Sequence, residues 1–351
     1  MQALVILKSA NLLKSIDKSK KMEIASGIHK LNVSMANSPL ANLNCYLIEG
    51  KTGWTMIDTG FFVPESFDSL RAGLDDLGIT FTDIANILVT HIHPDHFGLA
   101  GRIKHLSPHT LLLMHRFEAG LIESRYVKFF DLQTKIGVML ERHGVPSFDV
   151  SIFKSASMPT LEFVQITFPD QTFFGGEIVS TGIYDLEIIW TPGHAIGHIC
   201  IYEPKNRLLF SGDHILPIIT PNISYHVESG DNPLDDYLHA LHKIQNLPVA
   251  TVLPAHEHIF TDLRGRIYEI TEHHGTRKAE ILKILEKNTC NAYDISGQLT
   301  WNISDSDWES LPALHKRSAV METIAHLESM RWEHLVERII EDDLIFYRLQ
   351  G

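Results

Sequence analysis

Short apolar runs and amphipathic segments alternate along most of the chain. Between residues 24 and 91 the runs are apolar or alternate apolar with polar positions, and Gly, Asn or Ser bounds most of them: GIHKLNV, LNCYLIEG, GWTMIDTG and ANILVTH. This pattern is typical of strands. The segment SFDSLRAGLDDLG, which precedes the last run, has apolar residues at helical spacing and ends at Gly78, so it predicts a helix.

The same alternation returns after residue 170. The strand-like runs are FGGEIVS, YDLEIIWTPGH, HICIYEP, RLLFSGDH and ATVLPAH, and DDYLHALHKIQNL has helical spacing between the last two. Sheets built from hairpins as well as crossover helices favour two sheets covered by helices. We therefore predict an α/β protein with an αββα sandwich.

Two stretches depart from this alternation. Most of the first half of residues 115–175 has helical spacing, so we expect a largely helical insertion, with aromatic residues that pack in the core and a partial lid over the site. Residues 276–351 contain two amphipathic helices and end in a hairpin, which predicts a small winged-helix-like module. The remaining parts are a loosely attached extension, residues 1–22, and the sandwich domain, residues 23–275.

The composition is that of an ordinary globular protein, with 44% hydrophobic and 21% charged residues in a chain of 351. No apolar run reaches the roughly 18 residues that span a bilayer, and the N-terminal apolar patch is too short for a signal peptide. We therefore expect a cytoplasmic protein without a membrane partner. Three single cysteines, Cys45, Cys200 and Cys290, predict neither a disulfide scaffold nor a cysteine zinc site.

Charge and histidine content narrow the choice of partner. A formal net charge of −13 disfavours a polyphosphate as the main partner, although it leaves room for a local basic groove. The 21 histidines are a high number, and several lie in tight clusters. Clustered histidines favour metal binding.

The strand ends carry the candidate chemistry. Four metal-ligand side chains lie within six residues, where an apolar strand opens into a loop: His91, His93, Asp95 and His96. Imidazoles and a carboxylate crowded in this way are costly to bury without a cation. Three more polar side chains directly follow apolar strands: His194 in TPGH, Asp213 in SGD and His256 in PAH. Because loops at strand ends present functional groups to a cleft, we predict that these residues share one metal site.

The ordered motifs HIHPDH, TPGH, SGD and PAH resemble those of the metallo-β-lactamase superfamily over about residues 24–271. The resemblance implies the αββα fold predicted above, with a dinuclear metal site at one edge of the two sheets. It implies a first metal held by His91, His93 and His194, and a second held by Asp95, His96 and His256. Asp213 would bridge the two metals, and Asp95 and Asp213 would be the catalytic carboxylates.

The ligand types indicate the metals and the reaction. Nitrogen and oxygen ligands without a thiolate suit two zinc ions, and they also accept iron or manganese. Two such cations about 3.5 to 4 Å apart would share a hydroxide, which is a hydrolytic device. His93 departs from the glutamate of oxygen-reducing members, and Asp213 departs from the cysteine of the zinc β-lactamases that use one. The interval from Asp213 to His256 is too short for the inserted domain of nucleic-acid-processing members.

Other residues are candidates for supporting roles. Asp58, in MIDTG, resembles the family's buried aspartate that orients a metal-binding imidazole, and a turn aspartate is the alternative. His198 and His214 are expected to give hydrogen-bonding support. Tyr225 and His226 follow the bridging aspartate closely enough to reach substrate, and a surface position is the alternative for the tyrosine.

The C-terminal part has a family parallel of its own. Residues 276–351 resemble the winged-helix module of one superfamily subgroup, in which one mitochondrial member is an endoribonuclease for single-stranded RNA. Nine basic residues stand against thirteen acidic ones here, and the would-be wing carries Glu341, Asp342 and Asp343. Because such a wing repels phosphate, we expect a structural or dimer-forming module. The preceding helix places His273, His274 and Arg277 on one face, which we expect to be solvated.

The leading hypothesis is a binuclear metal-dependent hydrolase that uses a metal-bound hydroxide on a small ester-like substrate, a thioester or a lactone. The first alternative is a phosphodiesterase or single-strand endoribonuclease with the same metal site. The second is an inert lactamase-like domain carrying a nucleic-acid-binding winged helix. The complete ligand set argues against the second alternative, and the acidic tail argues against both. We expect a small-molecule substrate and leave open a homodimer.

Overall fold

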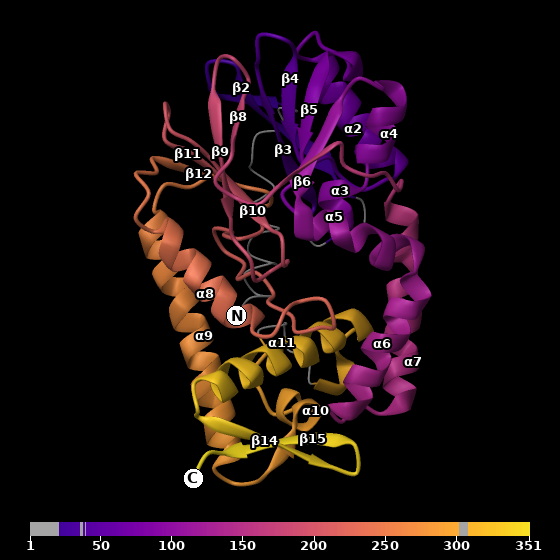
Figure 1. The fold of residues 1–351 in the computed structure, drawn as a ribbon, viewed down its shortest axis with the longest axis vertical. Coiled ribbons are helices and arrows are strands. Elements are labelled where there is room, and N and C mark those ends of the chain that lie inside the picture. Colours follow the sequence, from indigo (N-terminus) through magenta and orange to yellow (C-terminus); the bar gives the residue numbers. More distant parts are fainter. Residues whose placement is uncertain (1–20, 36–37, 39, 302–307) are drawn as a thin grey trace.

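The computed structural model describes residues 21–35, 38, 40–301 and 308–351 (Figure 1). Most of the predicted N-terminal extension, residues 1–20, lies outside the described residues. Its last two residues, Lys21 and Met22, belong to the first strand and pair with the second.

Two sheets form the centre of the larger domain. The first has seven strands in chain order: β1 (Lys21–Ala25), β2 (Ile28–Ser34), β3 (Asn42–Ile48), β4 (Trp54–Ile57), β5 (Ile84–Leu88), β6 (Leu111–His115) and β7 (Gln171–Phe173). The second has five strands, in the order β12 (Thr251–Pro254), β11 (Leu208–Gly212), β10 (Ile199–Glu203), β9 (Asp185–Trp190) and β8 (Ile178–Ser180). Strands β4 to β7 are parallel to one another, as are β11 and β12.

The two sheets pack face to face over a shared apolar core. Tyr46 and Leu88 from the first sheet and Ile188 and Phe210 from the second lie in one buried cluster. The rings of Tyr46 and Phe210 meet edge to face with centroids 5.2 Å apart, and the Tyr46 hydroxyl donates to the Pro254 carbonyl oxygen at 2.7 Å. Burial of this apolar surface holds the sheets together, and it fixes the relative position of the loops at their common edge.

Helices cover the outer face of each sheet. Helices α2 (Pro64–Asp75) and α4 (Ala100–Leu106) pack on the first sheet, and α8 (Pro233–Ile244) and α9 (Leu263–Leu285) pack on the second. Helix α8 shows why these segments are helical: the Asn232 side chain accepts from the Asp235 backbone N–H, and Pro233 begins the first turn. The predicted αββα sandwich is therefore confirmed.

The insertion extends from the first sheet towards the C-terminal module. It consists of α5 (Arg116–Ile122), the π-helical turn η3 (Glu123–Val127), α6 (Phe129–Arg142), α7 (Ser147–Ser157) and the 3-10 segment η4 (Met158–Phe163). The C-terminal module comprises α10 (Ala292–Ser296), α11 (Ala313–Trp332) and a sheet of β13 (Cys290–Asn291), β15 (Leu344–Leu349) and β14 (Val336–Glu341). In Figure 1 this module lies between α9 on one side and α6 and α7 on the other.

The module packs closely against the insertion. Its apolar stripe on α11, which includes Val320, Ile324 and Leu327, is fully buried and shares a cluster with Leu132 of α6 and Val150 of α7. Helix α9 runs through the predicted boundary between residues 275 and 276 without a break. The module has helices and a small sheet with a terminal ribbon, and its assignment as a winged helix stays a prediction.

The prediction of a solvated face at residues 273–277 is wrong for two of its three members. His274 and Arg277 are buried, because α11 packs against this face of α9. His274 Nδ1 lies 3.1 Å from His326 Nε2 of α11, and the Arg277 guanidinium lies over the Trp301 ring. Within the described residues, no helix combines the length and apolar character needed to cross a bilayer.

Candidate metal centre

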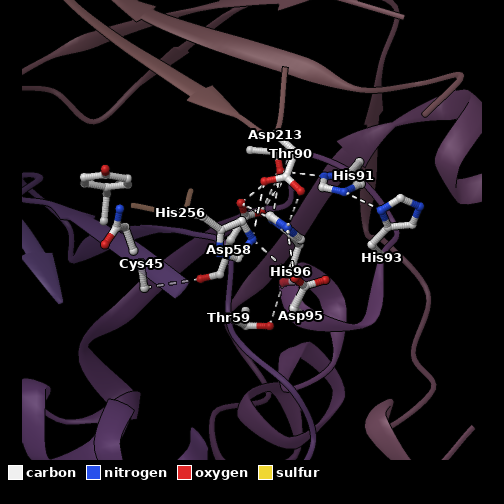
Figure 2. Close-up of polar contacts among 12 residues, drawn as sticks. Cys45, Asp58, Thr59, Thr90, His91, His93, Asp95, His96, Asp213 and His256 are labelled. Carbon is white, nitrogen blue, oxygen red and sulfur yellow. Dashed lines mark hydrogen bonds and ion pairs between the residues drawn. The ribbon is translucent and has the colours of Figure 1, made fainter. Parts of the chain in front are cut away.

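The predicted ligands all lie in segments that follow the ends of strands at one edge of the sandwich. His91, His93, Asp95 and His96 follow β5, and Asp95 and His96 are on the short helix α3 (Pro94–Phe97). Trp190 ends β9 before His194, Gly212 ends β11 before Asp213, and Pro254 ends β12 before His256. Figure 2 shows the side chains from the first sheet and the 91–96 loop converging with Asp213 and His256.

These side chains form three overlapping groups. In each group one atom per residue, a ring nitrogen or a carboxylate oxygen, lies within 4.8 Å of the others: His91, His93 and His194; His91, His96 and Asp213; Asp95, His96 and His256. Distances of this size let one cation contact every member of a group. The groups share His91 and His96, so they form one continuous centre.

Three imidazoles make up one end of this centre. His91 Nε2 lies 2.8 Å from His93 Nδ1, which lies 3.1 Å from His194 Nε2. Burial and then the neighbouring imidazoles hold the pKa of His91 and His93 well below the ordinary histidine value. Both rings are therefore neutral at pH 7, which is the form that binds a metal.

Two carboxylates and two imidazoles make up the other end. Asp213 Oδ2 lies 3.5 Å from His96 Nε2 and 3.7 Å from His194 Nε2, while its Oδ1 lies 3.4 Å from His256 Nε2. Asp95 Oδ2 lies 3.3 Å from His256 Nε2. Asp213 thus contacts residues of both ends, which is the position expected of a bridging ligand.

Charge in this cluster is strongly coupled. Burial opposes ionisation of Asp213, but His256 and His96 hold the pKa of its carboxyl well below the ordinary value. Burial likewise opposes protonation of His96, but the carboxylates, Asp95 foremost, raise its pKa well above the ordinary value. A metal at His96 therefore replaces a proton, as metal binding to ionisable ligands generally does.

The residues present fit divalent metal ions. His96 Nε2, His256 Nε2 and Asp213 Oδ1 are buried, and no atom of the described chain is hydrogen-bonded to them. A buried polar atom without a hydrogen bond costs about 1–3 kcal/mol, so three of them side by side favour a bound cation. Nitrogen and carboxylate donors without a thiolate are the ligands that zinc, iron and manganese accept.

A second set of contacts orients the ligands. Asp58 Oδ2 accepts from His96 Nδ1 at 2.8 Å, and its Oδ1 accepts from the Thr90 backbone N–H at 2.8 Å. Asp58 has a φ of 59°, in the left-handed region that favours glycine, and such strain is concentrated at functional sites. His256 Nδ1 donates to the Asn42 carbonyl oxygen at 3.1 Å. These bonds point the opposite ring nitrogens into the centre.

His198 and His214, the two histidines predicted to give hydrogen-bonding support, differ in their contacts. His198 Nε2 accepts from the Asp213 backbone N–H at 3.1 Å, and its Nδ1 donates to Thr191 Oγ1 at 2.9 Å, so this ring positions the Asp213 loop. Hydrogen-bonding support from the His214 ring is a wrong prediction, because neither ring nitrogen has a partner in the described chain. The ring instead packs edge to face on Tyr237, and burial lowers its pKa to about 3.

Side chains of the insertion hold the loop that carries His91 and His93. The sequence did not indicate these contacts. Glu118 Oε2 accepts from the Ile92 backbone N–H at 2.8 Å, and its Oε1 accepts from the Gly197 N–H at 2.6 Å. The Tyr126 hydroxyl donates to the Ile92 carbonyl oxygen. A Cβ at position 197 would lie 2.8 Å from Glu118 Cγ, so this close approach requires glycine.

A cavity of about 300 Å³ adjoins the centre. His93 and His194 are at the metal side, and α6 and α11 contribute the apolar residues Phe129, Leu132 and Met321. His226 also lines the cavity, whereas Tyr225 packs between two apolar clusters and donates its backbone N–H to the Met321 carbonyl oxygen. Their roles in substrate binding stay predictions.

Known proteins share this architecture. The family model described as "Metallo-beta-lactamase superfamily" matches residues 40–256. The chain is 24% identical over 311 residues to "Probable metallo-hydrolase YqjP" of Bacillus subtilis, which covers 86% of this chain and 92% of that protein. It is 22% identical over 285 residues to "Thioesterase pkgB" of Emericella nidulans, which covers 80% of this chain and 66% of that protein. The crystal structure of the metallo-beta-lactamase family protein TTHA1429 from Thermus thermophilus matches with a TM-score of 0.78 and 26% identity, over 93% of this chain and 100% of that chain. The chain therefore belongs to the metallo-β-lactamase superfamily, as one of its metallo-hydrolases.

Proposed function

We propose that the protein is a binuclear zinc-dependent hydrolase of a small ester-like substrate, and that this substrate is a thioester. The observation that carries the proposal is the complete set of seven nitrogen and oxygen ligand residues, with Asp213 between the two ends, beside a small and largely apolar cavity. One relative, named a thioesterase, supports this choice among ester-like bonds. A lactone is the nearest alternative substrate.

The residues at each end would hold one cation. His91, His93 and His194 would hold the first, and Asp95, His96 and His256 would hold the second. When bound, two divalent cations supply the Lewis acidity that activates water and polarises an acyl oxygen.

The chain supplies position and charge for the hydrolysis. The ionised Asp213 carboxylate lies between the two groups, and His198 fixes its backbone. Glu118 and Tyr126 hold the Ile92 peptide rigidly between His91 and His93. In the overall reaction the hydroxyl of water adds to the acyl carbon, the carbon–sulfur bond breaks, and the thiolate takes up the proton.

Phosphodiester hydrolysis could use the same ligands, and two observations argue against it. The cavity, at about 300 Å³, is at the lower end of the range for ligand pockets, and this size favours a small molecule over a polymer. The β14–β15 turn carries Glu341, Asp342 and Asp343, which repel a phosphate backbone.

Thiol release from short acyl thioesters tests the proposal. The zinc-loaded protein is assayed beside cleavage of a labelled single-stranded RNA and of a chromogenic phosphodiester. We expect turnover of thioesters that is lost in the Asp213→Ala variant. Cleavage of RNA or of the phosphodiester at a higher kcat/KM than any thioester or lactone would overturn the proposal.

A further inference from the structure

The cavity beside the metal centre contains a positive charge that the described part of the chain does not neutralise. Arg317, on α11, lines the same cavity as His93 and His194. It donates to Ser157 Oγ of α7 and to Gln133 Oε1 of α6, and both contacts are to neutral oxygens. Among the residues that the structure describes, Arg317 forms no ion pair.

The neighbouring arginine is held differently. Arg125, on η3, lies with its Nε 3.3 Å from Glu228 Oε2, and its Nη2 lies 3.3 Å from His226 Nε2. Burial and then the surrounding guanidinium groups hold the pKa of His226 well below its ordinary value, so this imidazole is neutral. Glu228 therefore balances Arg125, and the charge of Arg317 is left over.

The environment of Arg317 disfavours its charge. Burial, and then repulsion from Arg125, lower the pKa of Arg317 to about 10, which still leaves the guanidinium protonated at neutral pH. A partly buried charge without a counter-ion costs free energy, and an anion that enters the cavity recovers it. The planar guanidinium matches the oxygens of a carboxylate or a phosphate better than any other side chain does.

The apolar part of the lining suits the carbon chain of such a substrate. Tyr126, Phe129, Leu132, Ile136 and Met321 are apolar or aromatic and line the same cavity. They provide a surface for a short carbon chain. The lining of one cavity thus combines candidate metal ligands, a cationic side chain and apolar side chains.

We infer that Arg317 is a substrate-binding residue that selects thioesters bearing an anionic oxygen group, a carboxylate on the acyl part or a phosphate on the thiol part. The inference rests on the proposed function and names the substrate class of that site. It also assigns a function to the C-terminal module, which contributes a specificity residue to a metal centre built entirely by the larger domain.

Matched pairs of thioesters test the inference. The first pair is pentanoyl and glutaryl N-acetylcysteamine, which differ in a terminal carboxylate on the acyl part. The second pair is pentanoyl pantetheine with and without the 4′-phosphate. We expect wild-type kcat/KM to be at least about tenfold higher for the anionic member of one pair, which is the effect of one charge-assisted hydrogen bond.

Three variants locate the effect. Arg317→Gln should reduce the anionic-to-neutral ratio of kcat/KM towards one, chiefly through KM, and Arg317→Lys should restore part of the ratio because it keeps the charge without the fork geometry. Arg348→Gln removes an exposed arginine that pairs with Glu337 on the β-ribbon, and it should leave the ratio at the wild-type value. A preference in the first pair places the anion on the acyl part, and one in the second pair places it on the thiol part.

A binding measurement separates failure of this inference from failure of the proposed function. Glutarate and the uncharged butanamide are titrated calorimetrically into the metal-free wild-type protein and the Arg317→Gln variant. We expect glutarate to bind the wild type at least about tenfold more tightly than the variant, and butanamide to bind both equally. If no thioester is hydrolysed but this difference appears, the proposed reaction fails and the anion site stands.

Three results would overturn the inference. The first is hydrolysis of both members of each pair with equal kcat/KM by the wild type. The second is an equal loss for anionic and neutral members in Arg317→Gln, because that pattern indicates a structural role. Loss of single-stranded RNA cleavage in Arg317→Gln, with no effect on thioesters, would assign the arginine to a nucleic-acid phosphate and would also contradict the inference.

Discussion

The backbone carbonyl oxygen of Asn222 accepts a hydrogen bond from His194 Nδ1 at 2.9 Å. The side chain of the same asparagine donates to Glu322 Oε2 of α11 at 2.7 Å. One residue therefore connects a candidate metal ligand of the larger domain to the principal helix of the C-terminal module. The orientation of the His194 ring depends on a loop that the module itself holds in place.

Glu322 makes the stability of the protein depend on pH. Burial raises its pKa to about 7 from an ordinary value of 4.5. Between these values the unfolded chain binds fewer protons than the folded chain, so this residue's contribution to stability is present below about pH 4.5 and is lost as the pH rises through 7. Glu322→Gln keeps an oxygen for Asn222 and cannot ionise. We expect it to raise the melting temperature at pH 8 and to leave it nearly unchanged at pH 4.5.

Calorimetric melting at the two pH values measures this effect, and Glu309→Gln is the control, because the Glu309 side chain is exposed. An equal shift at both pH values would show that the ionisation of Glu322 is not its cause.

Glu118→Gln should loosen the loop between His91 and His93. An amide can accept from only one of the two N–H groups that the carboxylate now serves, so one buried bond to a charged group is lost. Losses of this kind cost about 1.5–3 kcal/mol. We expect the free energy of unfolding in urea to fall by that amount and zinc affinity to fall with it. Glu123→Gln, at an exposed position of the same insertion, should change neither, and wild-type values for Glu118→Gln would disprove the clamp.

Asp213→Ala should lower turnover of any genuine substrate by several orders of magnitude and leave the fold intact. The carboxylate lies between the two groups of ligands, and no other carboxylate in the described centre approaches both His194 and His256. Steady-state kinetics and circular dichroism measure the two effects, with Asp235→Ala on the exposed face of α8 as the control. Near-native turnover in Asp213→Ala would place the catalytic centre elsewhere.

Removal of metal should lower both activity and thermal stability. Buried side-chain atoms of the centre that lack a hydrogen bond destabilise the folded state unless a cation binds them. A cation present at 100 times its Kd stabilises the folded state by about 2.7 kcal/mol. We expect dialysis against a chelator to lower the melting temperature and zinc to restore it. His256→Ala should abolish most of that recovery, whereas the exposed His239→Ala should not. Identical melting of stripped and reloaded protein would refute a metal site here.

Truncation after about Arg277 should give an aggregating protein. The cut divides α9 and removes α11, which exposes the apolar surfaces of α6 and α7 that now share a buried cluster with Val320 and Ile324. Exposed apolar area of that kind drives association. Light scattering and size-exclusion chromatography report the outcome. A soluble, monomeric and fully active fragment would instead indicate that the module serves an external partner.

The candidate metal centre could be predicted from the sequence because its information is local. His91 to His96 lie within six residues, and each further ligand directly follows an apolar strand, so the strand pattern alone places them at one edge. The αββα layers could also be predicted, because the alternation of strands and helices is a local pattern as well. Histidines and aspartates that are clustered in this way have few explanations other than metal binding.

The cavity could not be predicted, because its walls come from segments far apart in the chain. Arg317 and Gln133 are 184 positions apart, and Glu118 and Gly197 are 79 apart. Local spacing cannot identify such pairs, and a glutamate on a helix has the same local pattern whether it is solvated or clamps a loop. The wrong predictions at His274 and His214 have this origin as well: one face of α9 is covered by α11, and Tyr237 occupies the space beside the His214 ring.

Helix α9, residues Leu263–Leu285, connects the larger domain to the C-terminal module as one unbroken helix. Each residue of an α-helix advances the chain by about 100° around the axis, so inserting or deleting one residue in its second half would rotate everything that follows by that angle. Arg317 and the apolar stripe of α11 would then face away from the cavity. The rotational position of the module about the α9 axis is therefore fixed by the number of residues in this helix.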